Sequence, residues 1–188
     1  MRRGGRVLTG VDRVELAYAR ALVADVVPVF GLIRSRVGYI LLDQVGMEQM
    51  IPLLSGPQTG EIAQAQQSQI WRRARKCAKA RVPPFLLRAM LRRRLPAGFA
   101  YVNVGHSNLT ERVLSAMRAM EAHVAVLIHD VIPLEFPEFQ RDGMVQPFAE
   151  MIARVGRYAD LIIYNSKDTQ ARAQAHLPQT TASIVSHL

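Results

Sequence analysis

The chain has 188 residues, of which 49% are hydrophobic, and a formal net charge of +9. These values fit a globular protein with a buried core and exclude a disordered chain. The apolar runs are too short to predict a membrane-spanning helix or a secretory signal. A single cysteine, Cys77, excludes an internal disulfide and a thiolate metal cluster, and favours a reducing, cytoplasmic location.

The positive charge is concentrated in one stretch. From Arg72 to Arg94 there are ten basic and no acidic residues, and the rest of the chain has 14 basic against 15 acidic residues. Such a field attracts phosphate groups. Two interpretations stay open on equal terms, namely a solvated helical surface and peripheral contact with an anionic membrane. Nucleic acid is not expected, because only Trp71 and Phe85 offer stacking surfaces there.

The first half of the chain begins with a helix signal. Thr9 followed by Asp12 three residues later predicts a capped helix start at Thr9-Gly10. Further predicted elements are strands at 26–33 and 37–42, a helix at 46–54, and a basic helical excursion at about 61–97 broken by prolines.

From Phe99 onward, strands and helices alternate regularly. The predicted strands are 99–104, 124–129, 161–164 and 183–185, and helices are predicted to begin near 109, 143 and 167, the first capped by Asn108. This alternation is typical of a parallel sheet in an α/β fold. The predicted fold class is therefore α/β, a Rossmann-like three-layer sandwich with a mostly parallel sheet, formed by a single domain over residues 1–188.

Three of these predicted strands end in polar residues, which are Gly105, His106 and Ser107, then His129 and Asp130, then Asn165 and Ser166. The carboxyl ends of parallel strands meet at one edge of the sheet, where ligands bind in open α/β folds. The sequence therefore predicts one crevice with several contributors. No metal ligand set and no cofactor motif is predicted.

His129 is the strongest single candidate, because it follows a buried strand and precedes a loop stiffened by prolines. The alternative is a strand-end histidine that hydrogen-bonds its own loop. For His106 the alternative is that Gly105 simply permits a tight turn. Asp130 is expected to hold the loop, and Asn165-Ser166 to cap the next helix, a geometry that also exposes backbone amides to anions.

Four segments in this order resemble the N-terminal domain of family 4 glycosyltransferases, which are retaining enzymes of the GT-B architecture, often mannosyltransferase-like. They are TGVDRVELAYARAL (9–22), YVNVGHSNL (101–109), VLIHDVIPLEFPEF (126–139) and ADLIIYNSKDT (159–169). The resemblance implies an acceptor-side domain that faces a nucleotide-sugar-binding domain across a cleft. It also implies a nucleotide-sugar donor, a glycan or lipid-linked acceptor, and no metal.

By the same resemblance, His129 reaches the donor sugar near the reacting centre, and the Thr9-Gly10 turn approaches the donor phosphate. The acceptor side of the cleft is lined by Gly105, His106, Ser107, Asp130, Asn165 and Ser166. The C-terminal domain of the family has no counterpart among these residues. We therefore expect a chain that is inactive alone and requires that domain or a partner chain. The alternative is a non-catalytic binding module, or a degenerate remnant, that pairs with another protein. The expected location is cytoplasmic, and under the membrane interpretation of the basic stretch the chain also contacts the inner face of the membrane through Arg72–Arg94.

Overall fold

The computed structural model describes residues 9–55, 62–178 and 181–187. The chain divides into two compact units, Met1–Met90 and Leu91–Leu188, and each is described by itself. The single domain predicted for 1–188 stays a prediction. None of the described helices is both long enough and apolar enough to cross a membrane.

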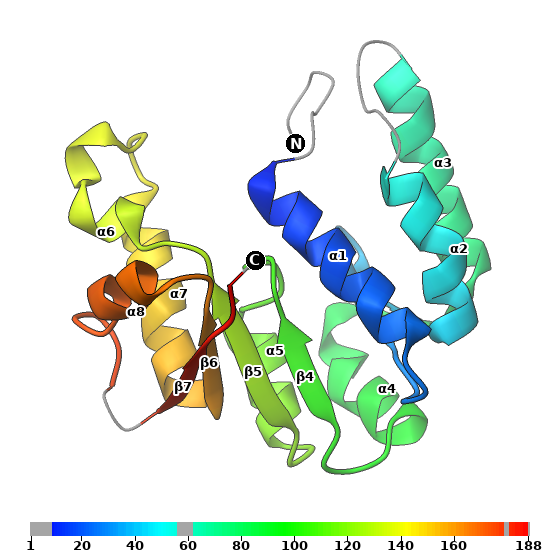
Figure 1. Cartoon of the computed structure of the whole chain (residues 1–188). Coiled ribbons are helices and arrows are strands. Elements are labelled where there is room, and N and C mark those ends of the chain that lie inside the picture. Colours follow the sequence, from blue (N-terminus) through cyan, green and yellow to red (C-terminus); the bar gives the residue numbers. More distant parts are fainter. Residues whose placement is uncertain (1–8, 56–61, 179–180, 188) are drawn as a thin grey trace. The chain divides into compact units, whose positions relative to one another are not determined.

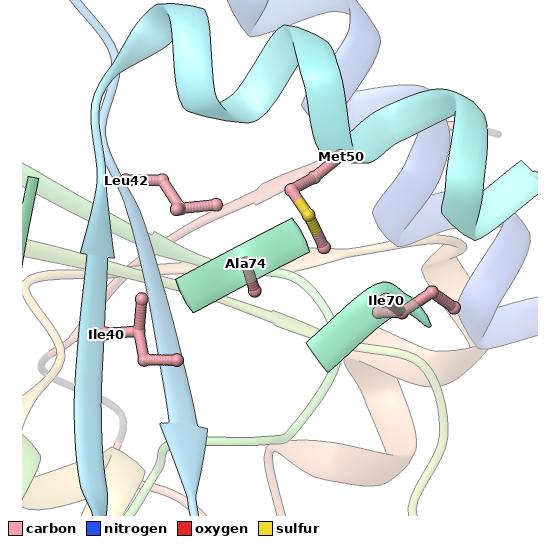
Figure 2. Packing of buried hydrophobic residues seen from close by; sticks show 5 residues of the cluster. All are labelled: Ile40, Leu42, Met50, Ile70 and Ala74. Carbon is pink, nitrogen blue, oxygen red and sulfur yellow. The ribbon is translucent and has the colours of Figure 1, made fainter. Parts of the chain in front are cut away.

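The first unit combines helices with an antiparallel sheet of order β1-β2-β3. Its elements are α1 (Gly10–Ala24), β1 (Gly31–Ser35), β2 (Gly38–Leu42), α2 (Gln44–Ser55), α3 (Ile62–Lys76), β3 (Ala78–Val82), η1 (Pro84–Leu86) and α4 (Leu87–Arg94), within which the unit boundary falls (Figure 1). Its small core is formed by Ile40, Leu42, Met50, Ile70 and Ala74 (Figure 2). Apolar side chains from β2, α2 and α3 thus hold this unit together.

Two sequence predictions differ from the structure of this unit. The first strand begins at Gly31 rather than at 26, because Val26 and Val27 are exposed and make no ladder. The excursion at 61–97 is not helical throughout, because β3 pairs with β2 in its middle. In β3 the cations Lys79 and Arg81 alternate with small apolar residues, which is the period of a half-buried strand.

The second unit contains a four-stranded parallel sheet of order β4-β5-β6-β7. Its elements are β4 (Ala100–Asn103), α5 (Glu111–Arg118), β5 (His123–Ile128), α6 (Ile132–Glu135), η2 (Pro137–Phe139), α7 (Val145–Tyr158), β6 (Leu161–Tyr164), α8 (Lys167–Ala173) and β7 (Ala182–Val185). The predicted fold class is confirmed: the chain is α/β, and its parallel sheet is flanked by helices, consistent with a Rossmann-like three-layer fold. All four strands predicted after residue 98 are present.

The two faces of the parallel sheet differ in burial. Val126 and its partner Ile162 lie on one face and are fully buried. Figure 1 shows α5 and α7 behind the sheet as drawn, and their residues Val113 and Val155 are also fully buried. On the opposite face Leu127 is buried at the centre, whereas the outer strands β4 and β7 carry exposed apolar residues. The centre of the sheet is therefore the most protected part of this unit.

The cap of α5 also differs from the prediction. Asn108 has a left-handed backbone with φ of 61° and does not cap the helix. Thr110 has the extended backbone of a cap residue, and its hydroxyl accepts a hydrogen bond from the Val113 amide at 3.4 Å. A side chain caps only from that extended backbone, so the helix begins after Thr110 instead.

Candidate functional site

The site begins with His129, the residue that directly follows β5. Its side chain is buried, with 8% exposed. Its Nε2 lies 2.7 Å from the backbone oxygen of Val104, in the segment that follows β4. A carbonyl oxygen only accepts, so Nε2 carries the proton and donates this hydrogen bond. His129 thus joins the ends of two neighbouring strands. The alternative interpretation, in which its side chain hydrogen-bonds its own loop, is not what the structure has.

His106 lies beside His129 in the same unit. The two rings meet edge to face with centroids 5.2 Å apart, and the Phe148 ring of α7 lies 6.3 Å from His106. The Nε2 atom of His106 is buried and has no hydrogen-bond partner among the described residues. Burial, and next the nearby His129, lower the pKa of His106 below its ordinary value. Both effects favour the neutral form of the His106 imidazole.

The segment that carries Gly105, His106 and Ser107 is organised by Asn103, the last residue of β4. The amide nitrogen of Asn103 donates to the backbone oxygen of Ser107, and its Oδ1 accepts from the backbone amide of His106 at 3.1 Å. Asn103 is buried, so these bonds replace the water that it lost on folding. They hold His106 with a left-handed backbone, φ 59°. Asn103 was missed by the sequence analysis, and its only signal was a polar residue within an apolar strand.

The end of β6 reaches the same histidine from the other side. Asn165 donates from Nδ2 to the backbone oxygen of His129 at 2.9 Å, and Thr169 donates to Asn165 Oδ1 at 2.8 Å. The Ser166 hydroxyl accepts from the Thr169 backbone amide at 3.0 Å and caps α8, as predicted. Thr169 is buried and was also missed, because nothing in the sequence distinguishes it from an exposed helix residue.

Asp130 holds the start of the loop after β5. Its Oδ1 accepts from the Ile132 backbone amide at 3.2 Å, which is the role expected from the sequence. Farther along, Glu135 lies 3.2 Å from Arg172 of α8, and Arg172 also pairs with Asp168 at 2.8 Å. The loop is thus fastened at both ends, to its own backbone and to α8.

Thr9 and Gly10 belong to the first unit. The predicted cap is present in full, because Thr9 Oγ1 accepts from the Asp12 amide at 3.2 Å while Asp12 accepts from the Thr9 amide at 2.8 Å. Among the described residues beyond its own neighbours and helix backbone, no heavy atom lies within 4 Å of the position that a Cβ of Gly10 would take. The described part of the chain therefore leaves the backbone there open to approach. The predicted site residues of the second unit therefore all lie at one edge of its sheet. Thr9 and Gly10 belong to the first unit and form no part of that group.

The arrangement leaves a hydrogen-bond acceptor of His129 available to a ligand. With Nε2 engaged, Nδ1 of a neutral His129 is an acceptor, and the described residues supply no hydrogen bond to it. Within the described part of the chain, no group of three or more His, Cys, Asp or Glu is placed to hold a metal ion. No family model matches the chain, and no curated protein or solved structure with which it was compared matches it either.

Proposed function

We propose that this chain is the acceptor-side domain of a retaining glycosyltransferase, which moves a sugar from a nucleotide-sugar donor to a glycan or lipid-linked acceptor. One observation carries the proposal: the polar ends of β4, β5 and β6 converge on His129 through the bonds to Val104 and from Asn165. This edge of a parallel sheet is where open α/β folds bind ligands. The four segments that resemble family 4 glycosyltransferases supply the choice of chemistry.

In this proposal His129 positions the donor sugar. The bond from Nε2 to Val104 fixes the tautomer and the ring, so that Nδ1 can accept from a sugar hydroxyl. A fixed dipole needs no reorganisation when charge develops at the reacting carbon, which is how such groups lower a barrier. Ser107 and Asn165 lie on the strand ends either side of His129 and are assigned to the acceptor.

The donor nucleotide is assigned to a second, nucleotide-sugar-binding domain, in the same polypeptide or in a partner chain. Thr9-Gly10 is assigned to the donor phosphate, because its backbone is open to approach. No metal enters the proposed reaction. The proposed location is the cytoplasm, where nucleotide sugars serve as donors for such enzymes.

The first test measures glycoside binding by the chain itself. Saturation-transfer NMR with methyl and octyl glycosides of mannose, glucose, galactose and N-acetylglucosamine should give a signal from at least one sugar. His129→Ala should remove it. The matched control is His123→Ala, which alters an exposed histidine at the opposite end of the same strand and should leave the signal unchanged.

The second test measures turnover, with the chain joined to or mixed with a nucleotide-sugar-binding domain. Nucleotide release from UDP-, GDP- and ADP-sugars should fall by about 100-fold or more in His129→Ala, while the melting temperature changes far less than turnover. Equal turnover in the His129 and His123 variants would remove His129 from the mechanism. The absence of both glycoside binding and turnover in the wild type would reject the proposal.

A second candidate is a non-catalytic module that binds another protein. It is favoured by a group of exposed apolar residues on the segment after His129, namely Ile132, Phe136, Phe139 and Met144. Exposed apolar patches mark interaction sites. This function predicts no glycoside signal in the wild type, together with a complex with a co-encoded protein that Phe139→Ser weakens. The transferase function instead predicts that the wild type gives a glycoside signal.

A further inference from the structure

Exposed apolar side chains gather at one end of the first unit. The turn between β1 and β2 carries Val37, which is 81% exposed, and the segment after β3 carries Phe85 and Leu86, which are 78% and 41% exposed. We name these three residues the apolar tip. Single exposed apolar residues are ordinary, but several that lie together on one surface mark an interaction site.

The strand register brings the two parts of the apolar tip together. Tyr39 pairs with Val82, so the next residue toward the turn, Gly38, lies beside Pro83. A Cβ at Gly38 would lie 2.0 Å from the Val82 oxygen and 2.8 Å from the Pro83 Cα. The turn therefore lies against the segment that leads into Phe85, and only a glycine permits this approach.

Exposed cations border the apolar tip. Arg36 precedes Val37, Arg81 lies near the end of β3, and Arg88 follows Phe85 by three residues. Among the described residues of the basic stretch, the structure shows one ion pair, Lys79 with Asp43 at 3.5 Å. This ion pair does not include Arg81 or Arg88. The surface therefore combines a protruding aromatic residue with positive charge.

The structure also separates α4 from this surface. Leu87, Met90 and Leu91 are buried, so the apolar side of α4 packs inside the protein. This agrees with the interpretation of a solvated helix for that part of the basic stretch. An interfacial helix lying flat on lipid would need those three side chains exposed. Phe85 and Leu86 lie just before the helix and remain outside.

We propose that the apolar tip and its border of Arg36, Arg81 and Arg88 dock onto the surface of an anionic lipid bilayer. Phe85 enters the headgroup region, where aromatic residues anchor proteins, and the guanidinium groups bind lipid phosphates. Charge complementarity selects this occupant. A single-stranded nucleic acid needs successive aromatic platforms, and the apolar tip has one aromatic ring. The inference does not depend on the proposed sugar transfer.

The experiment is sedimentation of the full chain with phosphatidylcholine vesicles, with and without phosphatidylglycerol. Binding should require phosphatidylglycerol and weaken in high salt, because the charge component is screened. Arg81→Gln combined with Arg88→Gln should weaken binding about 25-fold, at roughly fivefold per cation. Phe85→Ser should weaken binding about 10-fold, because the aromatic side chain that the bilayer would bury is lost.

Matched controls lie in the second unit. Arg112→Gln combined with Arg141→Gln removes the same charge from exposed positions, and Phe139→Ser changes a phenylalanine that is also 78% exposed. Both should bind vesicles almost as the wild type does. Thermal melting of each variant checks that the chain still folds.

Three results would overturn the proposal. The first is equal binding to neutral and anionic vesicles, or binding to neither. The second is loss of binding in the controls to the same extent as in the apolar tip variants. The third is evidence that another molecule occupies this surface. Such evidence would be an RNA duplex that binds through Arg81 and Arg88 when anionic vesicles do not bind, or a dimer in light scattering that Phe85→Ser converts to a monomer.

Discussion

The imidazoles of His106 and His129 meet edge to face, with ring centroids 5.2 Å apart and planes inclined by 70°. His106 follows β4 and His129 follows β5, so the contact couples two strand ends. A positive charge on His129 disfavours a positive charge on His106, and His129 is accordingly the second cause, after burial, of the lowered pKa of His106. The protonation state of His106 therefore bears on both the stability of the unit and the shape of the candidate site.

The first prediction concerns pH and His106. Its pKa in the folded chain lies below 6.5, owing to burial and then to His129. Just below 6.5 the unfolded chain therefore binds more protons than the folded chain. The free energy of unfolding should fall as the pH drops from about 7 to about 5, and recover above that window. His106→Asn should flatten this dependence, because asparagine tolerates the left-handed backbone and does not titrate.

Urea denaturation at several pH values provides the measurement. His123→Asn is the control, since His123 is exposed at the start of β5 and should keep the wild-type pH dependence. If His106→Asn shows the same slope as the wild type, the lowered pKa of His106 has no part in stability.

The second prediction concerns Asn103. Asn103→Ala should lower the free energy of unfolding by about 1–3 kcal/mol, because the Ser107 oxygen and the His106 amide lose a partner. It should also move the NMR resonances of the His106 ring. Gln146→Ala is the control, because it removes only an exposed hydrogen bond that the Gln146 side-chain amide donates to Glu150, and it should cost little stability. An unchanged His106 ring would mean that Asn103 does not position it.

The third prediction separates two roles of Ser166. Ser166→Ala should destabilise the chain by about 1 kcal/mol, the typical value of a helix cap. Ser166→Asp should restore stability, since aspartate caps equally well. If Ser166 also contacts the acceptor, the Asp variant should still bind glycosides poorly. Full recovery of both stability and glycoside binding in Ser166→Asp would leave capping as its only role.

The fourth prediction concerns Gly156 in α7. Helix propensity alone favours Gly156→Ala by about 1 kcal/mol, but the new Cβ would lie 2.6 Å from Pro178 Cδ and 3.3 Å from Leu177. A proline ring moves little, so we expect a net loss of about 1–3 kcal/mol in thermal or urea unfolding. Gly10→Ala is the control, because the added Cβ would meet no atom of the described residues within 4 Å beyond its own neighbours and helix backbone. A stabilised Gly156→Ala would show that Leu177-Pro178 moves aside.

Local patterns predicted the second unit well. The strand at 161–164 has the predicted bounds, because a short apolar run between polar residues is a sufficient signal for a buried strand. The Thr9 and Ser166 caps were also predicted, since a cap depends on residues within one turn. Asp130 holds its loop as expected for the same reason.

Tertiary pairing accounts for what the sequence did not reveal. The strand β3 carries a cation at every second position, and its identity as a strand depends on pairing with β2, almost forty residues earlier. Asn103 and Thr169 become site residues only because the chain brings Ser107, His106 and Asn165 to them. A hydrogen-bond partner that the tertiary fold supplies cannot be recognised from the neighbouring residues in the sequence.

The strand order β4-β5-β6-β7 has a consequence for how the second unit opens. Each strand is hydrogen-bonded only to its neighbours in the chain, so an outer strand can detach while the rest of the ladder stays intact. The four residues of β7 form the outermost strand and alternate between exposed and half-buried, whereas Leu127 and Ile162 at the centre are fully covered. Amide protons should thus exchange with solvent first at β7 and last at β5 and β6. The strands β5 and β6, which His129 and Asn165 directly follow, would keep their geometry while β7 detaches.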